Sequence, residues 1–364
     1  MKIYINGRFL TQKITGVQRY AFQLVRSIDN WLEQNGSGLT VTILVPGKSD
    51  LMIDIKLKNI LLKRIGRLKG HSWEQLELPF FSRGGFLVNL CNTGPMYKRM
   101  QQVTIHDAAV FANPKAFSRT FRSWYRYLLK RLTKSTSFIT TVSNFSRDEI
   151  SKYCDVTPCK ISVVYPGKEQ LEGELQPDNL FLKEQGLDQK KYILAVSSLN
   201  PNKNFNSILK AVDLMTKEYD VSIVVAGAIN RRVSGNYQLD NQSNVQYVGY
   251  VTDEQLIALY KNASCFVFPS FYEGFGLPPI EAMASGCPVI VSNTSSIPEV
   301  CGDAAVYCDP NSPQDIAEKI ELVIRDEELQ KSLRAKGLIQ VKKYNWNTSA
   351  NVFMSLLLQH IIKE

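Results

Sequence analysis

The chain has 364 residues, which is more than one hydrophobic core usually serves, so we expect two domains of ordinary size. A hydrophobic content of 44% and a charged content of 21% exclude a fibrous or intrinsically disordered protein. The formal net charge of +9 favours an anionic partner, and nucleic acid, a lipid surface and phosphorylated substrates are all open at this point.

The seven cysteines are scattered, and they form no C-x-x-C pair or Cys/His cluster with the spacing of metal ligands. We therefore expect reduced, mostly buried thiols in a cytoplasmic protein. The first residues run directly into a strand pattern without an apolar signal core, and no segment approaches the roughly 18 apolar residues that span a bilayer. The sequence thus predicts a protein that is neither secreted nor integral to a membrane.

Short β-rich runs alternate with helix-period segments in the first half, which is the pattern of βαβ units and a parallel sheet. An apolar repeat predicts a helix over Val17–Asn30, and Ser146 with Glu149 has the spacing of a capping box near the start of another helix. Strands are expected at Lys2–Ile5, Thr40–Val45, Phe86–Leu90, Val103–Ile105, Phe138–Thr141 and Ile161–Val164.

A polar stretch from Tyr165 to Asn179 has the composition of an interdomain linker, and a second βαβ series follows it. Helix starts are predicted by a capping box at Thr252 and Gln255 and by Ser312 before Pro313. Strands are expected at Tyr192–Val196, Val221–Ala226, Val245–Val248, Cys265–Phe268, Pro288–Val291 and Ala304–Tyr307.

These patterns predict an α/β protein with two Rossmann-like, doubly wound domains. We place the first domain at residues 1–168 and the second at residues 169–345. Residues 346–364 contain a helix that is apolar on one side, and we expect it to pack back on the first domain.

Doubly wound sheets bind ligands at the loops that follow their strands. The segment Phe268–Val289 leaves a buried strand, passes through a glycine loop and enters a helix. Gly274 and Gly276 would let backbone N–H groups approach an anion at the helix N-terminus, where the dipole favours phosphate. Glu281 is expected in the first helical turn, where it could accept bonds from two vicinal hydroxyls. Alternatively, Glu273 and Glu281 only complement the helix dipole.

The string from Glu273 to Glu281 resembles the E-x7-E segment of retaining glycosyltransferases with the GT-B fold, in the large group commonly numbered family four. The resemblance implies that Glu273 contacts hydroxyls of the transferred sugar and that Glu281 binds the ribose of the donor. It also implies that sugar and phosphate are held by the amides of Gly274, Phe275, Gly276 and Leu277.

A second loop, Ser197–Asn204, follows the first strand of the second half. We assign Ser197 and Lys203 to donor binding, with Lys203 as a point charge for the diphosphate, and a solvated loop lysine is the alternative. Family members often pair this lysine with an arginine, but this chain has Ser198 and Asn202 at those positions. Arg231 or Arg232 could supply the second cation.

Three further positions are assigned from the same resemblance. Gly16 opens the first helix, where the family has a glycine-rich turn that faces the donor phosphates or the acceptor. His106, in the segment Thr104–Asp107, matches a histidine that lies near the transferred sugar. Tyr250 and Val251 match a loop that contacts the base largely through backbone groups, so the identity of the base leaves little side-chain signature.

Residues 115–134 carry seven Lys and Arg residues and no acidic residue, interleaved with aromatic rings, which predicts a basic amphipathic helix. A solvated face over a core stripe, an interfacial membrane helix and a nucleic-acid patch are the three interpretations. We retain an anionic membrane surface as a partner, with the protein peripheral on its inner face, and we expect no nucleic acid.

The resemblance implies a retaining, metal-independent glycosyltransferase of polysaccharide biosynthesis that uses no cofactor. It would move a hexose, either mannose, glucose or a deoxyhexose, from a nucleotide-diphosphate sugar to a glycan or lipid-linked acceptor. Glu273, His106 and Lys203 would be its catalytic residues. Two alternatives are a catalytically inactive sugar-nucleotide or lipid-binding protein and another GT-B enzyme, such as a sugar-nucleotide epimerase or a phosphorylase.

Overall fold

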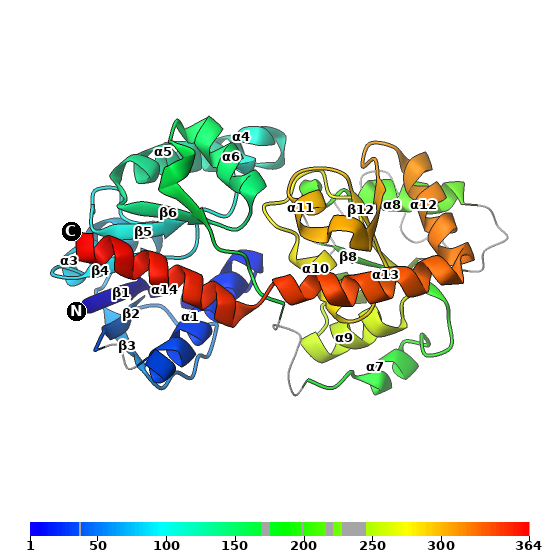
Figure 1. Cartoon of the computed structure of the whole chain (residues 1–364), viewed down its shortest axis with the longest axis horizontal. Coiled ribbons are helices and arrows are strands. Elements are labelled where there is room, and N and C mark those ends of the chain that lie inside the picture. The colour runs from blue at the N-terminus through cyan, green and yellow to red at the C-terminus, as the bar shows by residue number, and fades with distance from the viewer. Residues whose placement is uncertain (36–37, 169–174, 198–199, 216–220, 228–244, 364) are drawn as a thin grey trace. The chain divides into compact units, whose positions relative to one another are not determined.

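The computed structural model describes residues 1–35, 38–168, 175–197, 200–215, 221–227 and 245–363 (Figure 1). The chain divides into two compact units. The first comprises Met1–Gly167 and Tyr344–Glu364, and the second comprises Lys168–Lys343. Each unit is built on one parallel sheet, which confirms the expected pair of Rossmann-like α/β folds.

The first unit has a seven-stranded parallel sheet in the order β3-β2-β1-β4-β5-β6-β7. In the centre of this sheet, Ile3 of β1 lies beside Val41 of β2 on one side and Phe86 of β4 on the other. The strands are β1 (Lys2–Asn6), β2 (Thr40–Pro46), β3 (Ile60–Ile65), β4 (Phe86–Asn89), β5 (Gln101–Thr104), β6 (Phe138–Thr141) and β7 (Ile161–Val163).

Helices and short helical turns connect these strands. Between β3 and β4 the helical path contains a π-helical turn, η2 (Trp73–Glu77), flanked by α2 (Gly70–Ser72) and α3 (Leu78–Phe81). The other connecting elements are η1 (Gly7–Thr11), α1 (Gly16–Asn35), α4 (Ala109–Ala112), η3 (Pro114–Ala116), α5 (Arg119–Ser135), α6 (Asn144–Cys154) and η4 (Pro158–Lys160).

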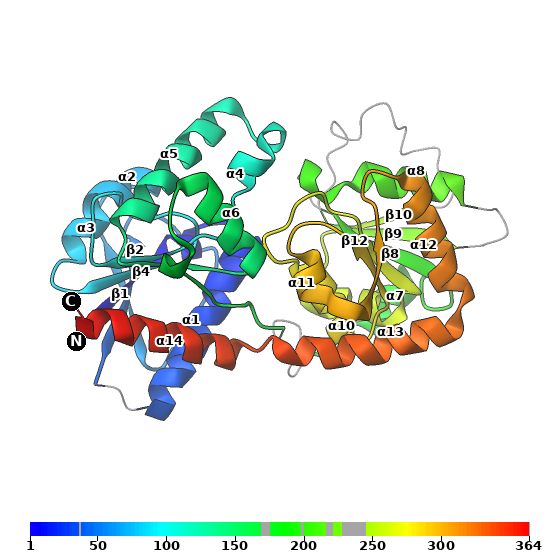
Figure 2. The ribbon, with the colours of Figure 1, turned by 45° about the horizontal axis from the view of Figure 1, so that its top comes forward.

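The closing helix α14 (Trp346–Lys363) belongs to the first unit and packs across α1 (Figure 2). The rings of Trp346 and Tyr20 meet edge to face with centroids 5.4 Å apart, and His360 stacks on Phe138 at 4.2 Å. The side chains of Phe353, Met354 and Leu357 on this helix are at most 1% exposed. Burial of such side chains, at about 1.5–3 kcal/mol each, holds the end of the chain on this unit.

The second unit has a six-stranded parallel sheet in the order β10-β9-β8-β11-β12-β13. Its strands are β8 (Tyr192–Ser197), β9 (Ser222–Gly227), β10 (Val245–Gly249), β11 (Cys265–Phe268), β12 (Val289–Ser292) and β13 (Ala305–Cys308). Its helical elements are α7 (Asn179–Glu184), η6 (Pro201–Lys203), α8 (Phe205–Leu214), α9 (Asp253–Asn262), α10 (Leu277–Ala284), α11 (Ile297–Cys301), η8 (Gly302–Ala304), α12 (Pro313–Arg325), α13 (Glu327–Gln340) and η9 (Val341–Lys343).

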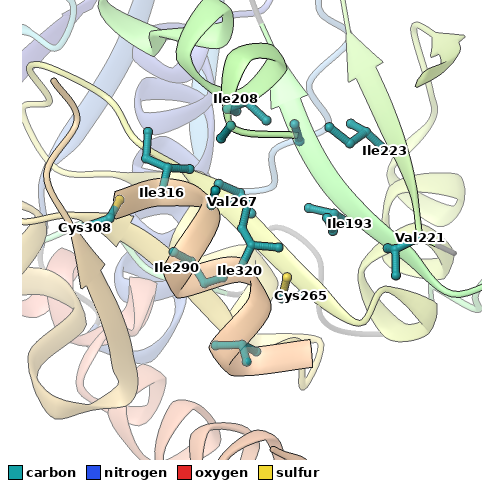
Figure 3. Packing of buried hydrophobic residues seen from close by; sticks show 14 of the residues in the cluster. Ile193, Ile208, Val221, Ile223, Cys265, Val267, Ile290, Cys308, Ile316 and Ile320 are labelled. Atoms are coloured by element: carbon teal, nitrogen blue, oxygen red, sulfur yellow. The ribbon is translucent and has the colours of Figure 1, made fainter. Parts of the chain in front are cut away.

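The core of the second unit lies between the sheet and the helices α8 and α12 (Figure 3). Ile193, Val267 and Ile290 come from three adjacent strands, and Ile316 and Ile320 of α12 pack on them. Each of these five side chains is at most 1% exposed. The strands therefore read as continuous apolar runs, which is the pattern expected of a parallel sheet covered on its faces.

The expected strands are confirmed to within two residues at each end, with one omission. The structure adds β3, a segment in which the sequence analysis predicts no strand. This segment contains Lys63 and Arg64, and four of its six residues are exposed. Because β3 is an edge strand, its charged side chains can face water, and its pattern lacks the apolar run of a buried strand.

Two expected helix starts are confirmed and two are wrong. Thr252 with Gln255 forms the capping box of α9, and Ser312 caps α12 before Pro313. Helix α6, however, is capped by Ser143, which has extended backbone angles, so the expected cap Ser146 lies inside the first turn. Likewise, the basic helix does not begin at residue 115. Helix α5 begins at Arg119 because Ser118 caps it, and residues 114–116 form a separate turn.

Within the described residues, no helix has both the length and the apolar content needed to cross a bilayer. Five of the seven cysteines are buried, Cys91 is half-buried and Cys159 is exposed, in keeping with the expected mostly buried thiols.

Candidate active site

The residues singled out in the second half of the sequence gather at the carboxyl edge of the second sheet. β8 and β11 are neighbours there, although two strands separate them in the sequence. The chain order of the strands reverses between them, and such switch points are where doubly wound sheets bind ligands. Lys203 follows β8 and Glu273 follows β11, so the sheet order alone brings the two loops side by side.

Hydrogen bonds join the loop that carries Lys203 to the loop that follows β11. Asn204 has a left-handed backbone, with φ of 53°, and its buried side-chain amide donates to the carbonyls of Pro269 at 3.0 Å and Pro310 at 2.7 Å. The amide of Phe271 in turn donates to the carbonyl of Asn202 at 2.8 Å. The backbone on both sides of Lys203 is therefore fixed relative to the loop that carries Glu273.

Lys203 and Glu273 form an ion pair, with Nζ 2.7 Å from Oε1. Their side chains are 21% and 13% exposed, so the pair is sheltered but accessible. The Lys203 ammonium also lies 4.7 Å from the centre of the Phe268 ring, which adds a cation–π contact. The structure thus joins two predicted catalytic residues that are 70 positions apart in the sequence.

The Glu273 loop is held by two serines that the sequence analysis missed. The amide of Glu273 donates to Ser295 Oγ at 3.0 Å, and Ser296 Oγ lies 2.9 Å from the carbonyl of Glu273 and 3.0 Å from that of Phe275. Ser296 is fully buried, and Ser295 has a left-handed φ of 54°. The cluster of hydroxyl residues directly after strand β12, on the same sheet edge, is the signal that could have identified them.

Gly276 is the N-cap of α10 and has φ of 103°, a conformation that side-chain-bearing residues rarely adopt. A Cβ at this position would lie 2.6 Å from Ile297 Cδ1. The next residues include Pro278 and Pro279, which carry no amide hydrogen, so Leu277 is the backbone donor in the first three positions of the helix. This end of the helix is suited to an anion approaching the backbone.

Glu281 lies one turn further into α10 than expected. The helix begins at Leu277, so Glu281 is its fifth residue and not part of the first turn. Because side chains on a helix lean toward its N-terminus, a residue four positions along still points to the end capped by Gly276. Glu281 is only 6% exposed, and Tyr260 Oη lies 3.5 Å from its Oε2.

The remaining donor-site predictions lie on loops of the second unit. Tyr250 and Val251 lie between β10 and α9, and the Tyr250 side chain is 86% exposed. Ser197 is the last residue of β8. The side chain of Ser197, and the whole of Ser198, Arg231 and Arg232, lie outside the described residues.

His106 lies in the first unit, just beyond β5, and is 7% exposed. Its Nε2 is 2.9 Å from the carbonyl of Leu90, so Nε2 carries the proton and Nδ1 is the acceptor. Its own amide donates to Asn92 Oδ1 at 2.6 Å, and the Tyr20 ring packs against the imidazole edge to face. Burial lowers the pKa of His106 to about 4, although the bond to Leu90 opposes the shift.

Gly16 is the first residue of α1, in the first unit, and is exposed. The carbonyl of Thr15 accepts the amide of Arg19 at 2.9 Å, and the Thr15 amide donates to Gln18 Oε1 at 3.2 Å. The helix N-terminus predicted at this position is therefore present. Gly16 and His106 belong to the first unit, and Lys203 and Glu273 belong to the second.

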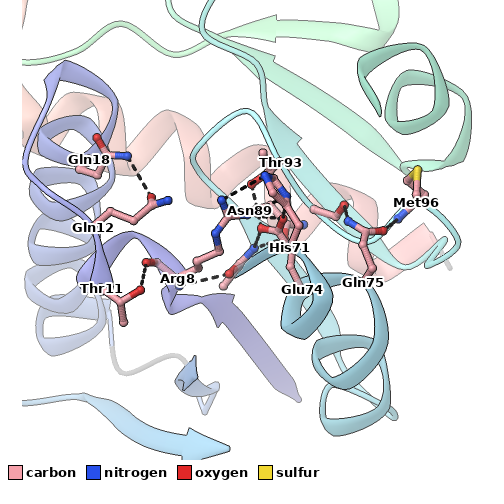
Figure 4. A network of polar contacts seen from close by, with 12 residues as sticks. Arg8, Thr11, Gln12, Gln18, His71, Glu74, Gln75, Asn89, Thr93 and Met96 are labelled. Carbon is pink, nitrogen blue, oxygen red and sulfur yellow. Dashed lines mark hydrogen bonds and ion pairs between the residues drawn. The ribbon is translucent and has the colours of Figure 1, made fainter. Parts of the chain in front are cut away.

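A buried polar network that the sequence analysis did not predict lies at the end of β1 (Figure 4). Glu74, on the π-helical turn, is fully buried and accepts from Arg8 at 2.6 Å, Thr93 at 2.7 Å and Asn6 at 2.8 Å. Burial alone would raise the pKa of Glu74, but the hydrogen bond with His71 and the charge of Arg8 outweigh it and lower that pKa. His71, which matched no motif, is thus part of this network.

Among the described residues, no group of three or more His, Cys, Asp or Glu side chains is arranged to hold a metal ion.

Comparison with known proteins identifies the family. The sequence profile described as glycosyl transferases group 1 matches residues 178–338. The chain is 32% identical to O-antigen chain mannosyltransferase B of Escherichia coli, over 95% of this chain and 96% of that protein. Among solved structures it is similar to sucrose-phosphate synthase from Thermosynechococcus elongatus, with a TM-score of 0.76 and 17% identity over 100% of this chain and 99% of the other.

A second solved structure, Anabaena Alr3699/HepE in complex with UDP and glucose, has a TM-score of 0.71 and 15% identity over 98% of each chain. At these identities the structural matches establish the fold, which is GT-B, while the full-length sequence match establishes the family. The chain therefore belongs to the group 1 glycosyl transferases and is a glycosyltransferase.

Proposed function

We propose that this enzyme transfers a hexose, most specifically mannose, from a nucleotide-diphosphate sugar to a glycan or lipid-linked acceptor in polysaccharide assembly. The choice of mannose and of this pathway class is supported by the relative named as an O-antigen chain mannosyltransferase. The observation that carries the proposal is the Lys203–Glu273 pair beside the start of α10. We expect the reaction at the cytoplasmic face of a membrane, where a lipid-linked acceptor is presented.

Donor binding would use the end of α10 and the lysine loop. The Leu277 amide and the helix dipole favour a phosphate at Gly276, and Lys203 supplies a full positive charge beside it. Glu281 would accept hydrogen bonds from the ribose hydroxyls, since its side chain points toward the same helix end. Tyr250 and Val251 would lie against the base.

In the proposed reaction, Lys203 would exchange its partner Glu273 for the diphosphate of the donor. When the donor diphosphate enters, the Lys203 ammonium would move toward it, and the Glu273 carboxylate would accept hydrogen bonds from hydroxyls of the sugar instead. The bond from the anomeric carbon to the phosphate oxygen breaks as the acceptor oxygen attacks the same face. The acceptor proton passes to the departing diphosphate. Positive charge from Lys203 and the helix end supports a transition state that needs no metal ion.

His106 would act as a neutral hydrogen-bond acceptor for a hydroxyl of the donor sugar. Its Nε2–H is engaged by Leu90, which leaves Nδ1 as the accepting atom. The lowered pKa of His106, caused by burial, keeps the ring neutral at pH 7, so a role as a general acid is not favoured. Gly16, at the N-terminus of α1, would face the phosphates or the acceptor.

The donor is tested by thermal shift with GDP-mannose, UDP-glucose, UDP-N-acetylglucosamine and dTDP-rhamnose, followed by transfer to octyl α-mannoside. Of these four donors, we expect GDP-mannose to stabilise the protein. The product should be α-linked, with the anomeric configuration of the donor retained when it is read by NMR. Turnover should survive a chelator, and dependence on added manganese would refute the metal-independent mechanism. Tight binding without transfer would instead indicate an inert binding protein, and donor conversion without acceptor would indicate an epimerase or phosphorylase.

A further inference from the structure

The first sheet has a switch point of its own, between β1 and β4. The chain order of the strands reverses there, and doubly wound sheets bind ligands at the carboxyl edge of such a point. The side-chain amide of Asn6, at the end of β1, donates to Asn89 Oδ1 of β4 at 3.0 Å and to Glu74 Oε1 at 2.8 Å. The buried network of Glu74 therefore lies at the switch point of the first sheet, as the Lys203–Glu273 pair does in the second.

Three consecutive residues after β4 connect this network to the positions assigned near the reaction. Cys91 Sγ lies 3.7 Å from the carbonyl of Val17, in the first turn of α1. Asn92 Oδ1 accepts the amide of His106 at 2.6 Å, and Thr93 Oγ1 donates to the buried carboxylate of the network at 2.7 Å. The network thus shares one edge of the first sheet with the start of α1 and with the histidine assigned to the donor sugar.

Arg8 and His71 are the accessible members of the network (Figure 4). Their side chains are 11% and 35% exposed, whereas that of Glu74 is 0% exposed. His71 Nδ1 is engaged within the network, 3.3 Å from Glu74 Oε2 and 3.1 Å from Arg8 Nη1. His71 Nε2 has only a long contact of 3.4 Å to Arg8 Nη2. A ligand hydroxyl would serve Nε2 in either tautomer, because a hydroxyl both donates and accepts.

The charges of the network favour a neutral ligand. Arg8 and Glu74 carry opposite charges and form an ion pair at 2.6 Å. An anion that drew Arg8 away would leave a buried carboxylate without its counter-charge, which is strongly unfavourable. A guanidinium has five N–H donors, so Arg8 can donate to a neutral hydroxyl without leaving Glu74. Hydroxyl groups therefore suit this position better than a phosphate.

Aromatic rings of α5 pack beside the same histidine. The His71 ring meets Trp124 and Tyr125 edge to face, with centroids 5.6 and 6.2 Å apart. Tyr125 stacks at 4.2 Å on Phe121, which is 41% exposed. Trp124 Nε1 is buried and has no hydrogen-bond partner in the described part of the chain. Aromatic rings around a few convergent polar groups are the composition of a site for a small ligand.

We propose that Arg8 and His71 bind the terminal neutral hexose of a glycan acceptor, and that the buried Glu74 is a positioning residue that holds both side chains. This inference rests on the proposed function, and it narrows the acceptor to one that is recognised by sugar hydroxyls. One hydroxyl would bond His71 Nε2, and another would accept a free N–H of Arg8. The apolar face of the hexose would pack on the aromatic rings.

The test measures the binding of octyl α-mannoside separately from its use as an acceptor. His71→Phe keeps an aromatic ring but removes both ring nitrogens, while Glu74 retains its other three partners. Loss of one hydrogen bond should raise both the KM for octyl α-mannoside and its Kd, read by saturation-transfer NMR with GDP present, about three- to tenfold. The Kd for GDP-mannose and its hydrolysis without acceptor should keep their native values.

Two further variants separate the network from its surroundings. Leu76 lies on the same π-helical turn as Glu74 and is 68% exposed, so Leu76→Ala is the matched control and should keep the native KM and Kd for octyl α-mannoside. Glu74→Gln weakens the hold on Arg8 and should raise the KM for octyl α-mannoside while the Kd for GDP-mannose stays native. If Glu74→Gln does not fold, His71→Phe decides the matter.

An unchanged Kd for octyl α-mannoside in His71→Phe, or an equal increase in Leu76→Ala, would overturn the proposal. An equal loss of affinity for GDP-mannose would also overturn it, because the network would then serve the donor. Methyl α-mannoside should compete better than its 6-phosphate, and the reverse order would indicate an anion site instead. If the native chain transfers no mannose but His71→Phe still weakens the binding of octyl α-mannoside, the proposed reaction fails and the acceptor site stands.

Discussion

Gly276 offers a quantitative test of how the start of α10 is built. In Gly276→Ala the new methyl carbon lies 2.6 Å from Ile297 Cδ1, and the backbone must keep φ of 103°. The left-handed conformation costs about 1–2 kcal/mol for a residue with a side chain. Relieving the overlap in a packed core adds about 1–3 kcal/mol. We therefore expect a loss of about 2–5 kcal/mol in the free energy of unfolding.

Gly286 at the other end of the same helix is the control. It has φ of 73°, and a methyl group there meets no atom within 4 Å. Gly286→Ala should therefore cost only the conformational part, about 1–2 kcal/mol. A third change, Ile297→Val, removes the Cδ1 atom and should partly rescue Gly276→Ala, so that the two changes are non-additive in a double-mutant cycle.

The assay is urea unfolding of the native chain, the three single variants and the Gly276→Ala/Ile297→Val double variant, combined with sugar transfer at a temperature where all five proteins remain folded. Gly276→Ala should lose most of its activity, because the altered loop displaces the Leu277 amide and the Glu273 backbone next to it. Gly286→Ala should keep its activity. Equal destabilisation by the two alanine substitutions, or no rescue by Ile297→Val, would refute the steric reasoning.

Two further results are expected. Lys203→Met should lower kcat by about 10²–10³ with little change in fold, because the ammonium stabilises the departing diphosphate, and a near-native kcat would contradict that role. An ordinary histidine binds a proton near pH 6.5, whereas burial lowers the pKa of His106 to about 4, so between these values the unfolded chain holds more protons. The contribution of neutral His106 to the free energy of unfolding is therefore fully present above pH 6.5, and it is about 2 kcal/mol smaller at pH 5. In urea titrations His106→Gln should lose less stability over this range, and identical pH profiles would refute the assignment.

Much of the architecture follows from local sequence patterns. Apolar runs of three to six residues alternating with segments of helical period predict parallel strands with helical connections, and the structure places twelve of these strands where they were expected. The edge strand β3 was missed because its exposed Lys63 and Arg64 break the apolar run. The E-x7-E string was informative because its glycine suits the positive φ at the N-cap of α10 and its prolines suit the first turn of that helix.

The order of the strands in each sheet, which only the tertiary structure shows, decided which of these residues contact one another. Lys203 meets Glu273 because β8 pairs with β11 across the switch point of the sheet, and Ser296 holds the Glu273 loop because β12 lies beside β11. Similarly, Arg8 and Glu74 are 66 residues apart and meet only in the folded first unit. Local sequence specifies which side chains follow each strand. Which of them become partners depends on the order in which distant strands pair, and that order is stabilised only by the packing of the assembled core.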